Sequence, residues 1–251
     1  MKLGRSCQIT IGTNNVKESY DFYQLLGFRK LAEDQHPFPW IKMTDDSIVI
    51  LLYENGDSYV GLTYFDSDME QIASQLGKEG IKFVQRGNRE NIFISPTDTI
   101  VILVKADHEA MLAPKNSMLL DLNDSDYAHP DRYPNKALGI FGEFSHPVQD
   151  IEEAIVFWEK MGFRLHHQVE SPYPWALMYD GNMILGLHET TDFDNLALSY
   201  FAPDVKEKVK QLEEAGVYSI TEYRGHGGDE NNVVIRTPEN QQIFLFQSLA
   251  V

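Results

Sequence analysis

The sequence predicts an α+β fold in which four strand–helix–three-strand (βαβββ) modules pair into two open barrel-like halves. Two observations predict it. The second half of the chain repeats the first, and each half shows the same order of strand-like and helix-like segments twice over. The length of 251 residues agrees with one large domain or two compact ones, at about 150 residues per domain.

The repeat appears when the chain is shifted by 135 residues. Residues 16–54 then lie over 151–189, and 12 of the 39 pairs are identical. A Pro-aromatic-Pro-Trp motif stands at 37–40 and again at 172–175. Unrelated segments of this length share far fewer identities, so the pattern indicates an internal duplication.

The boundaries of the halves follow from the same comparison. The offset grows to 142 residues at Pro96 and Pro238, so the second half carries an insertion. We expect a first half of two modules over 1–106, a polar linker over 107–138, and a second half of two modules over 139–251.

Each half begins with a strand that leads into an amphipathic helix. Asn15 and Asp150 are the expected N-caps of these helices, and Gly27 and Gly162 are the expected stops. Apolar runs such as 48–52 have no polar face, so both faces of each sheet must be covered. Helices cover one face, and a second sheet or a lined cavity faces the other.

Composition excludes several classes of function. The 21 basic and 38 acidic residues give a net charge of 21 − 38 = −17, which disfavours nucleic acid and anionic membranes as partners. The single cysteine, Cys7, excludes an intrachain disulfide and a cysteine-based metal cluster. Neither a membrane-spanning run nor a signal-peptide core is evident. We expect a cytoplasmic protein, monomeric or homodimeric, whose partner is a small molecule.

Further signals point to a family. An aromatic pair on the first helix of each half precedes a Gly-Phe step, at 22–28 and 157–163, and Pro-containing turns precede the last strands, at 96–98 and 238–240. With four modules, this pattern resembles the vicinal oxygen chelate superfamily, which includes glyoxalase I, extradiol dioxygenases, and the fosfomycin- and bleomycin-resistance proteins. The resemblance covers nearly all of the chain except the linker. It implies the fold rather than a function, because this fold hosts unrelated chemistries.

The resemblance also implies where a metal ion would bind, since the superfamily's enzymes hold a divalent metal inside an open barrel. Counting from the aromatic pair places the ligand positions on Gln8, Leu51, Tyr59 and Ile102 in the first half, and on Glu143, Gly186, Asn195 and Phe244 in the second. Only Glu143 is a good ligand, whereas a catalytic metal needs about three. The extradiol dioxygenases keep two His and one Glu in the second half, and this chain does not. We expect no cofactor. The alternative is one divalent metal ion on Glu143 and His188, after a two-residue shift along the strand.

Strand alternation selects candidate ligand-binding residues in the second half. Phe144 suits the helix side, so Glu143 and Ser145 face the concave side. Gly186 and His188 face the same side. Glu143 is either a binding or general-base carboxylate or a solvated rim residue, and His188 is either a site residue or a strand-end histidine. The remaining candidates on this side are Asn195, Ser199, Gln242 and the apolar wall residue Phe244.

Two further signals have alternative interpretations. Trp40 and Trp175 occupy the same place in each half, where an indole either stacks on a flat ligand or fixes the entrance of a strand. His226 lies in the glycine-rich insertion, which is either a loop over the pocket mouth or a surface turn.

Three functions are consistent with these residues. The first is a metal-free protein that binds a small, partly aromatic metabolite or antibiotic, mainly in the second half. The second is a lyase, isomerase or dioxygenase with an atypical metal site around Glu143 and His188, or metal-free acid–base chemistry by that pair. The third is a scaffold whose cavities are filled by side chains. The absence of three good ligands and the aromatic content favour the first.

Overall fold

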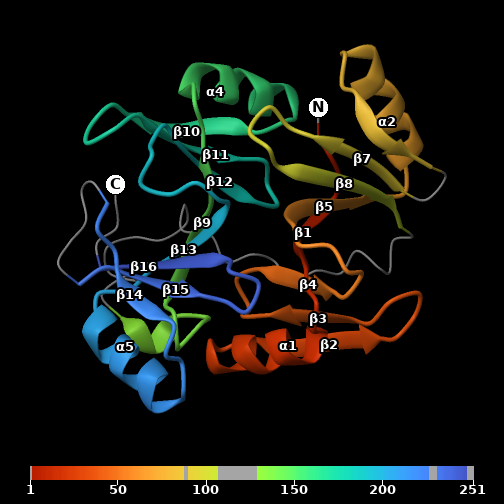
Figure 1. Cartoon of the computed structure of the whole chain (residues 1–251). Coiled ribbons are helices and arrows are strands. Elements are labelled where there is room, and N and C mark those ends of the chain that lie inside the picture. The colour runs from red at the N-terminus through yellow and green to blue at the C-terminus, as the bar shows by residue number, and fades with distance from the viewer. Residues whose placement is uncertain (1, 88–89, 107–128, 226–230, 248–251) are drawn as a thin grey trace.

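The computed structural model describes residues 2–87, 90–106, 129–225 and 231–247. It contains two eight-stranded mixed sheets, one from each half of the chain, and each sheet carries helices on one face (Figure 1). The predicted α+β fold of four βαβββ modules in two open halves is confirmed.

The first half follows the order strand, helix, three strands twice. Its elements are β1 (Ser6–Gly12), α1 (Val16–Leu25), β2 (Arg29–Asp34), β3 (Trp40–Thr44), β4 (Val49–Tyr53), β5 (Val60–Asp66), α2 (Met69–Lys78), β6 (Phe83–Arg86), β7 (Glu90–Ile94) and β8 (Ile100–Lys105).

The second half repeats this order after a short 3-10 helix, η3 (Pro130–Arg132). Its elements are β9 (Ile140–Pro147), α4 (Ile151–Lys160), β10 (Arg164–Val169), β11 (Trp175–Tyr179), β12 (Ile184–His188), β13 (Ala197–Phe201), α5 (Val205–Glu214), β14 (Ile220–Glu222), β15 (Val233–Arg236) and β16 (Gln242–Phe246).

The two sheets have the same topology. The strand order is β2-β3-β4-β1-β5-β8-β7-β6 in the first and β10-β11-β12-β9-β13-β16-β15-β14 in the second. The first strands of the two modules, β1 with β5 and β9 with β13, pair antiparallel at the centre. Each sheet therefore curls around a central pair of strands and remains open at its two edge strands.

Local sequence sets the helix ends as predicted. The Asn15 and Asp150 side chains accept hydrogen bonds from the backbone N–H groups of Glu18 and Glu153, which caps α1 and α4. After each helix the chain turns through Gly27 or Gly162, both at positive φ. Val16, Tyr20 and Tyr23 of α1 are buried against the first sheet, in agreement with their helical spacing.

Two buried tyrosine–aspartate hydrogen bonds join the halves, which lie side by side in Figure 1. The Tyr64 hydroxyl donates to Asp180 Oδ2 at 2.8 Å, and the Tyr200 hydroxyl donates to Asp45 Oδ2 at 2.7 Å. Since 180 − 45 = 135 and 200 − 64 = 136, the two bonds are equivalent under the internal duplication. The halves therefore face each other across an approximate twofold axis.

The C-terminal part of the expected linker is also packed between the halves. Asn135 is 1 % exposed, and its amide donates to Leu26 O and to Asp45 Oδ2. Residues 107–128 of that expected linker lie outside the described part of the chain. Among the described residues, no helix is long and apolar enough to cross a membrane.

Candidate ligand-binding site

The concave face of the second sheet carries a row of small side chains. Gly186, Ser145, Ala197 and Gln242 stand in register across β12, β9, β13 and β16. Small residues occupy the first three positions, so the sheet offers little side-chain bulk there. The sequence-predicted residues Gly186, Ser145 and Gln242 are therefore brought together in one row.

Glu143 belongs to the next row, where it faces Ser199 and then Phe244. Its side chain leans over Gly186: a Cβ atom at position 186 would lie only 2.1 Å from the Glu143 carboxyl carbon. Any side chain at position 186 would thus occupy the space of the carboxylate. Glycine is required at position 186 because the Glu143 side chain approaches its backbone closely, and not because of an unusual φ angle.

Glu143 is 6 % exposed, and hydrogen bonds compensate its burial. Oε1 accepts a bond of 2.7 Å from the Ser145 hydroxyl and lies 2.5 Å from His188 Nε2. Ser145 also bonds to Ser199 Oγ at 2.6 Å. Oε2 accepts no hydrogen bond from the described residues.

His188 is held on both ring nitrogens. Nε2 contacts Glu143, and Nδ1 lies 3.2 Å from the Tyr173 hydroxyl. A neutral imidazole with its proton on Nε2 satisfies both contacts, because it donates to the carboxylate and accepts from the phenol. Burial raises the pKa of Tyr173, which keeps that hydroxyl protonated as a donor. The Trp175 ring stacks on the imidazole at 6.1 Å with an interplanar angle of 17°.

Aromatic side chains line the site beside Glu143 and His188, on the side of β13 and β16. Phe193 lies 5.5 Å from the His188 ring and 5.3 Å from the Phe244 ring. Tyr223 packs on both Phe244 and Phe246 at 5.3–5.4 Å. Burial and the charge of Asp192 raise the pKa of Tyr223 to about 12. The cluster is separate from the main core, so it belongs to the concave face rather than to the helix layer.

Gln242 contributes an unsatisfied polar group to this face. The residue is 8 % exposed, and its side-chain Oε1 is buried without a hydrogen-bond partner among the described residues. Leaving a buried acceptor unpaired costs about 1–3 kcal/mol. This oxygen is closed to solvent, so a ligand reaches it only when neighbouring side chains move.

The first half carries different residues at the equivalent positions. Gln8, Leu51 and Tyr53 stand where the second half has Glu143, Gly186 and His188. The buried hydroxyl pair is kept, because Thr10 Oγ1 and Thr63 Oγ1 lie 2.7 Å apart. The carboxylate–imidazole pair is therefore specific to the second half, where the glycine makes room for it.

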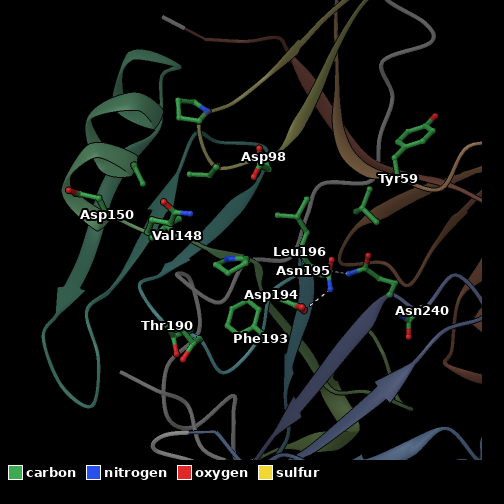
Figure 2. A pocket seen from close by; sticks show the side chains of 18 of the residues that line it. Tyr59, Asp98, Val148, Asp150, Thr190, Phe193, Asp194, Asn195, Leu196 and Asn240 are labelled. Carbon is green, nitrogen blue, oxygen red and sulfur yellow. Dashed lines mark hydrogen bonds between the residues drawn. The ribbon is translucent and has the colours of Figure 1, made fainter.

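A cleft lies between the two halves (Figure 2). This inter-half cleft has a volume of about 780 Å³ and is lined by the β4–β5 and β12–β13 loops and by the turns before β8 and β16. Asn195 lines it and is exposed, with its amide on Asp194. Because β13 begins only at Ala197, strand alternation does not extend to residue 195 and does not assign the direction of this side chain. Phe193 separates the cleft from His188.

Three of the residues predicted from the sequence remain to be placed. Trp175 lies on the concave face, against His188. Trp40 is half-buried at the equivalent place in the first half, opposite Tyr53. His226 lies outside the described residues.

Solved structures that match this arrangement include extradiol dioxygenases. Homoprotocatechuate 2,3-dioxygenase from Brevibacterium fuscum, in its E323L form, matches with a TM-score of 0.64 at 13 % identity over 98 % of this chain and 72 % of that chain. The enzyme from Arthrobacter globiformis matches with a TM-score of 0.63 at 14 % identity over 98 % and 80 %. A catechol 2,3-dioxygenase matches with a TM-score of 0.58 at 13 % identity over 100 % and 96 %.

The chain has the vicinal oxygen chelate fold. These identities establish the fold alone. No protein-family model matches the sequence, and a comparison with curated proteins found no match.

The residues present do not fit the metal that the vicinal oxygen chelate fold implies. Of the four expected positions in the second half, Gly186 and Phe244 carry no donor and Asn195 lies in the inter-half cleft. Only Glu143 remains of the four. With His188, which the two-residue shift adds, there are two donors, and they bind each other. No group of three or more His, Cys, Asp or Glu in the described part of the chain is placed to hold a metal ion. A catalytic metal in this fold needs about one more protein ligand than this face offers.

Sequence reasoning missed three residues of the site: Tyr173, Phe193 and Tyr223. Tyr173 was visible only as part of the Pro-aromatic-Pro-Trp motif. Phe193 lies in the loop between β12 and β13, and Tyr223 follows the short strand β14, so neither belongs to a periodic segment that predicts a side-chain direction. The duplication contains a partial signal, since Phe38 at the equivalent of Tyr173 also packs on its partner, Tyr53, at 5.9 Å.

Proposed function

We propose that this protein binds a small, partly aromatic molecule on the concave face of its second half, without a metal ion. The observation that carries the proposal is the buried Glu143–His188 pair over Gly186, walled by Trp175, Phe193 and Phe244. The first half has the same backbone and lacks the pair, which indicates that the pair serves something other than the fold.

The unpaired acceptors define the ligand. Glu143 Oε2 and Gln242 Oε1 both lack a donor among the described residues, so they suit a molecule with hydrogen-bond donors at two points. A ring that carries donor groups, one of them cationic for Glu143, suits these acceptors and the aromatic side chains around them.

Binding is favoured over acid–base catalysis by the state of His188. A general base needs a free nitrogen within hydrogen-bond reach of the proton it removes. Both nitrogens of His188 are engaged, by Glu143 and by Tyr173. The imidazole therefore orients the carboxylate rather than receiving a proton from a substrate.

Tryptophan fluorescence tests the proposal, with tyramine as the first probe. Tyramine carries a ring between a hydroxyl and an ammonium group. We expect it, or a related compound in a panel of aromatic amines and phenols, to quench Trp175. Replacing the carboxylate in Glu143→Gln should weaken binding about tenfold, because hydrogen bonds to charged groups contribute about 1.5–3 kcal/mol.

Two tryptophan variants identify which indole the ligand quenches. Trp175→Phe should remove the quenching, while Trp40→Phe, at the equivalent place in the first half, should keep it. If no compound in the panel quenches Trp175, or if Glu143→Gln binds as tightly as the native protein, the proposal fails. The first of these results would support a scaffold whose concave face is filled by Phe193 and Phe244.

The alternative candidate is a divalent-metal-dependent lyase, isomerase or dioxygenase at the same pair. The fold it shares with homoprotocatechuate 2,3-dioxygenase favours this alternative. The two-residue donor set opposes it. Metal retention by the native protein separates the two proposals.

A further inference from the structure

The first half carries an unpaired lysine on its concave face. Lys42 lies on β3, in register with Leu51 of β4 and, one strand further, with Thr10 of β1. Its side chain is half-buried, and its Nζ lies 5.7 Å from the centre of the Phe65 ring on β5. Lys42 has no carboxylate partner among the described residues, although the chain has 38 acidic residues.

Other donors lie beside this ammonium group. Gln8, on the neighbouring row, is 3 % exposed, and its side-chain amide makes no hydrogen bond with the described residues. Thr10 and Thr63 share a single hydrogen bond, so one hydroxyl hydrogen of the pair remains free to donate. A buried amide and a half-buried ammonium group without partners are costly unless a ligand satisfies them.

Neither acidic residue that alternation places on this face, Asp34 or Glu90, pairs with the lysine. Asp34 accepts from the backbone N–H groups of Gln35 and His36. Glu90 is exposed at the start of β7, and its carboxylate accepts from the Gln85 amide. Burial, with a smaller contribution from the charge of Glu90, raises the pKa of Tyr53, whereas the pKa of Lys42 is lowered by burial alone. The donor group of Lys42 is therefore open to an anion from outside the chain.

We propose that the concave face of the first half binds a small organic carboxylate with a flat body. The carboxylate would lie on Lys42 and Gln8, and the flat body against Phe65 and Trp40. The site is independent of the one around Glu143, and the two halves would thus take ligands of opposite polarity. At the equivalent of Lys42 the second half has Leu177, and at the equivalent of Glu143 the first half has Gln8.

Benzoate is the test probe, with benzamide as its neutral counterpart. In the intact native protein, followed by amide-resolved NMR, we expect benzoate to shift first-half signals and benzamide to shift them much less. Lys42→Met should weaken benzoate binding about tenfold or more, since it removes a charged donor. Lys42→Arg, which keeps the charge, should retain most of the binding and guards against a general effect on folding.

A matched control comes from the other half. Leu177→Met changes the equivalent position of the second sheet and should leave benzoate binding unchanged, as should Glu143→Gln. Three results would overturn the proposal: no binding of benzoate, equal binding of benzoate and benzamide, or equal binding by Lys42→Met and the native protein when both show the same thermal melting. A failure of tyramine to bind at the Glu143 site would not affect it.

Discussion

The carboxylate of Glu143 occupies the space that a side chain at residue 186 would need. A Cβ atom there would lie 2.1 Å from the carboxyl carbon, and the equivalent residue of the first half is Leu51, opposite Gln8. The absence of a side chain at residue 186 on β12 and the carboxylate on β9 therefore belong together. This paired difference distinguishes the second half from the first.

Gly186→Leu should disrupt the site, because it restores the first-half residue without restoring Gln8. The new side chain displaces the Glu143 carboxylate from Ser145 and His188, and overpacking of this kind costs about 1–3 kcal/mol. Urea unfolding measures the loss. The control is Gly77→Ala in α2, where a Cβ meets no atom within 4 Å. It should be neutral or stabilise by about 0.5–1 kcal/mol. Equal stability of Gly186→Leu and the native protein would show that Glu143 is not held in this position.

The two tyrosine–aspartate bonds between the halves should differ in strength. Tyr64→Phe leaves Asp180 Oδ2 without its hydroxyl donor, whereas after Tyr200→Phe, Asp45 Oδ2 keeps the amide of Asn135. We expect a loss of about 1.5–3 kcal/mol for Tyr64→Phe and a smaller loss for Tyr200→Phe.

Chemical denaturation measures both losses. Tyr218→Phe, which changes a tyrosine that is 84 % exposed, is the control. If neither Tyr64→Phe nor Tyr200→Phe changed the free energy of unfolding, these bonds would not hold the halves together.

Acid should destabilise the protein through His146. This residue of β9 is fully buried, its Nδ1 lies 2.9 Å from Thr99 Oγ1 of the first half, and its ring packs edge-on against Trp158. Burial, with a smaller contribution from the charge of His188, lowers its pKa from 6.5 to about 3. Because the folded pKa lies below the unfolded one, the stabilisation is complete above pH 6.5 and is lost as the pH falls towards 3. At pH 4.5 the loss should be roughly 3 kcal/mol.

Urea unfolding at pH 7 and pH 4.5 tests this assignment. His146→Phe should be less stable than the native protein at pH 7, since Thr99 loses its partner, but should lose less on acidification. The exposed His36 serves as the comparison in His36→Asn, which should keep the native pH dependence. An unchanged acid loss in His146→Phe would assign the effect to other groups.

Sequence reasoning predicted most of the fold because the duplication and strand alternation are local patterns. Alternation placed Glu143, Ser145, Gly186 and His188 on one face, and the structure brings them together. It did not extend to Asn195, because alternation holds only within a regular strand and β13 begins two residues later.

Contacts between segments far apart in sequence had no local signal. The bond between Tyr64 and Asp180 spans 116 residues, and Phe193 reaches His188 from an irregular loop. Such contacts depend on how the two halves pack and on loop conformations that tertiary structure determines. The residues that decide the character of the site, Tyr173, Phe193 and Tyr223, were therefore the ones that sequence patterns could not assign.

The central claim is that Glu143 and His188 receive a ligand molecule rather than a metal ion. Metal retention tests it most directly. Untagged protein is incubated with iron, manganese, zinc and nickel, desalted, and assayed by elemental mass spectrometry beside Glu143→Gln. The account predicts no retained metal above the level of the variant. Close to one ion per chain in the native protein, lost in Glu143→Gln, would contradict it and place metal-dependent chemistry first.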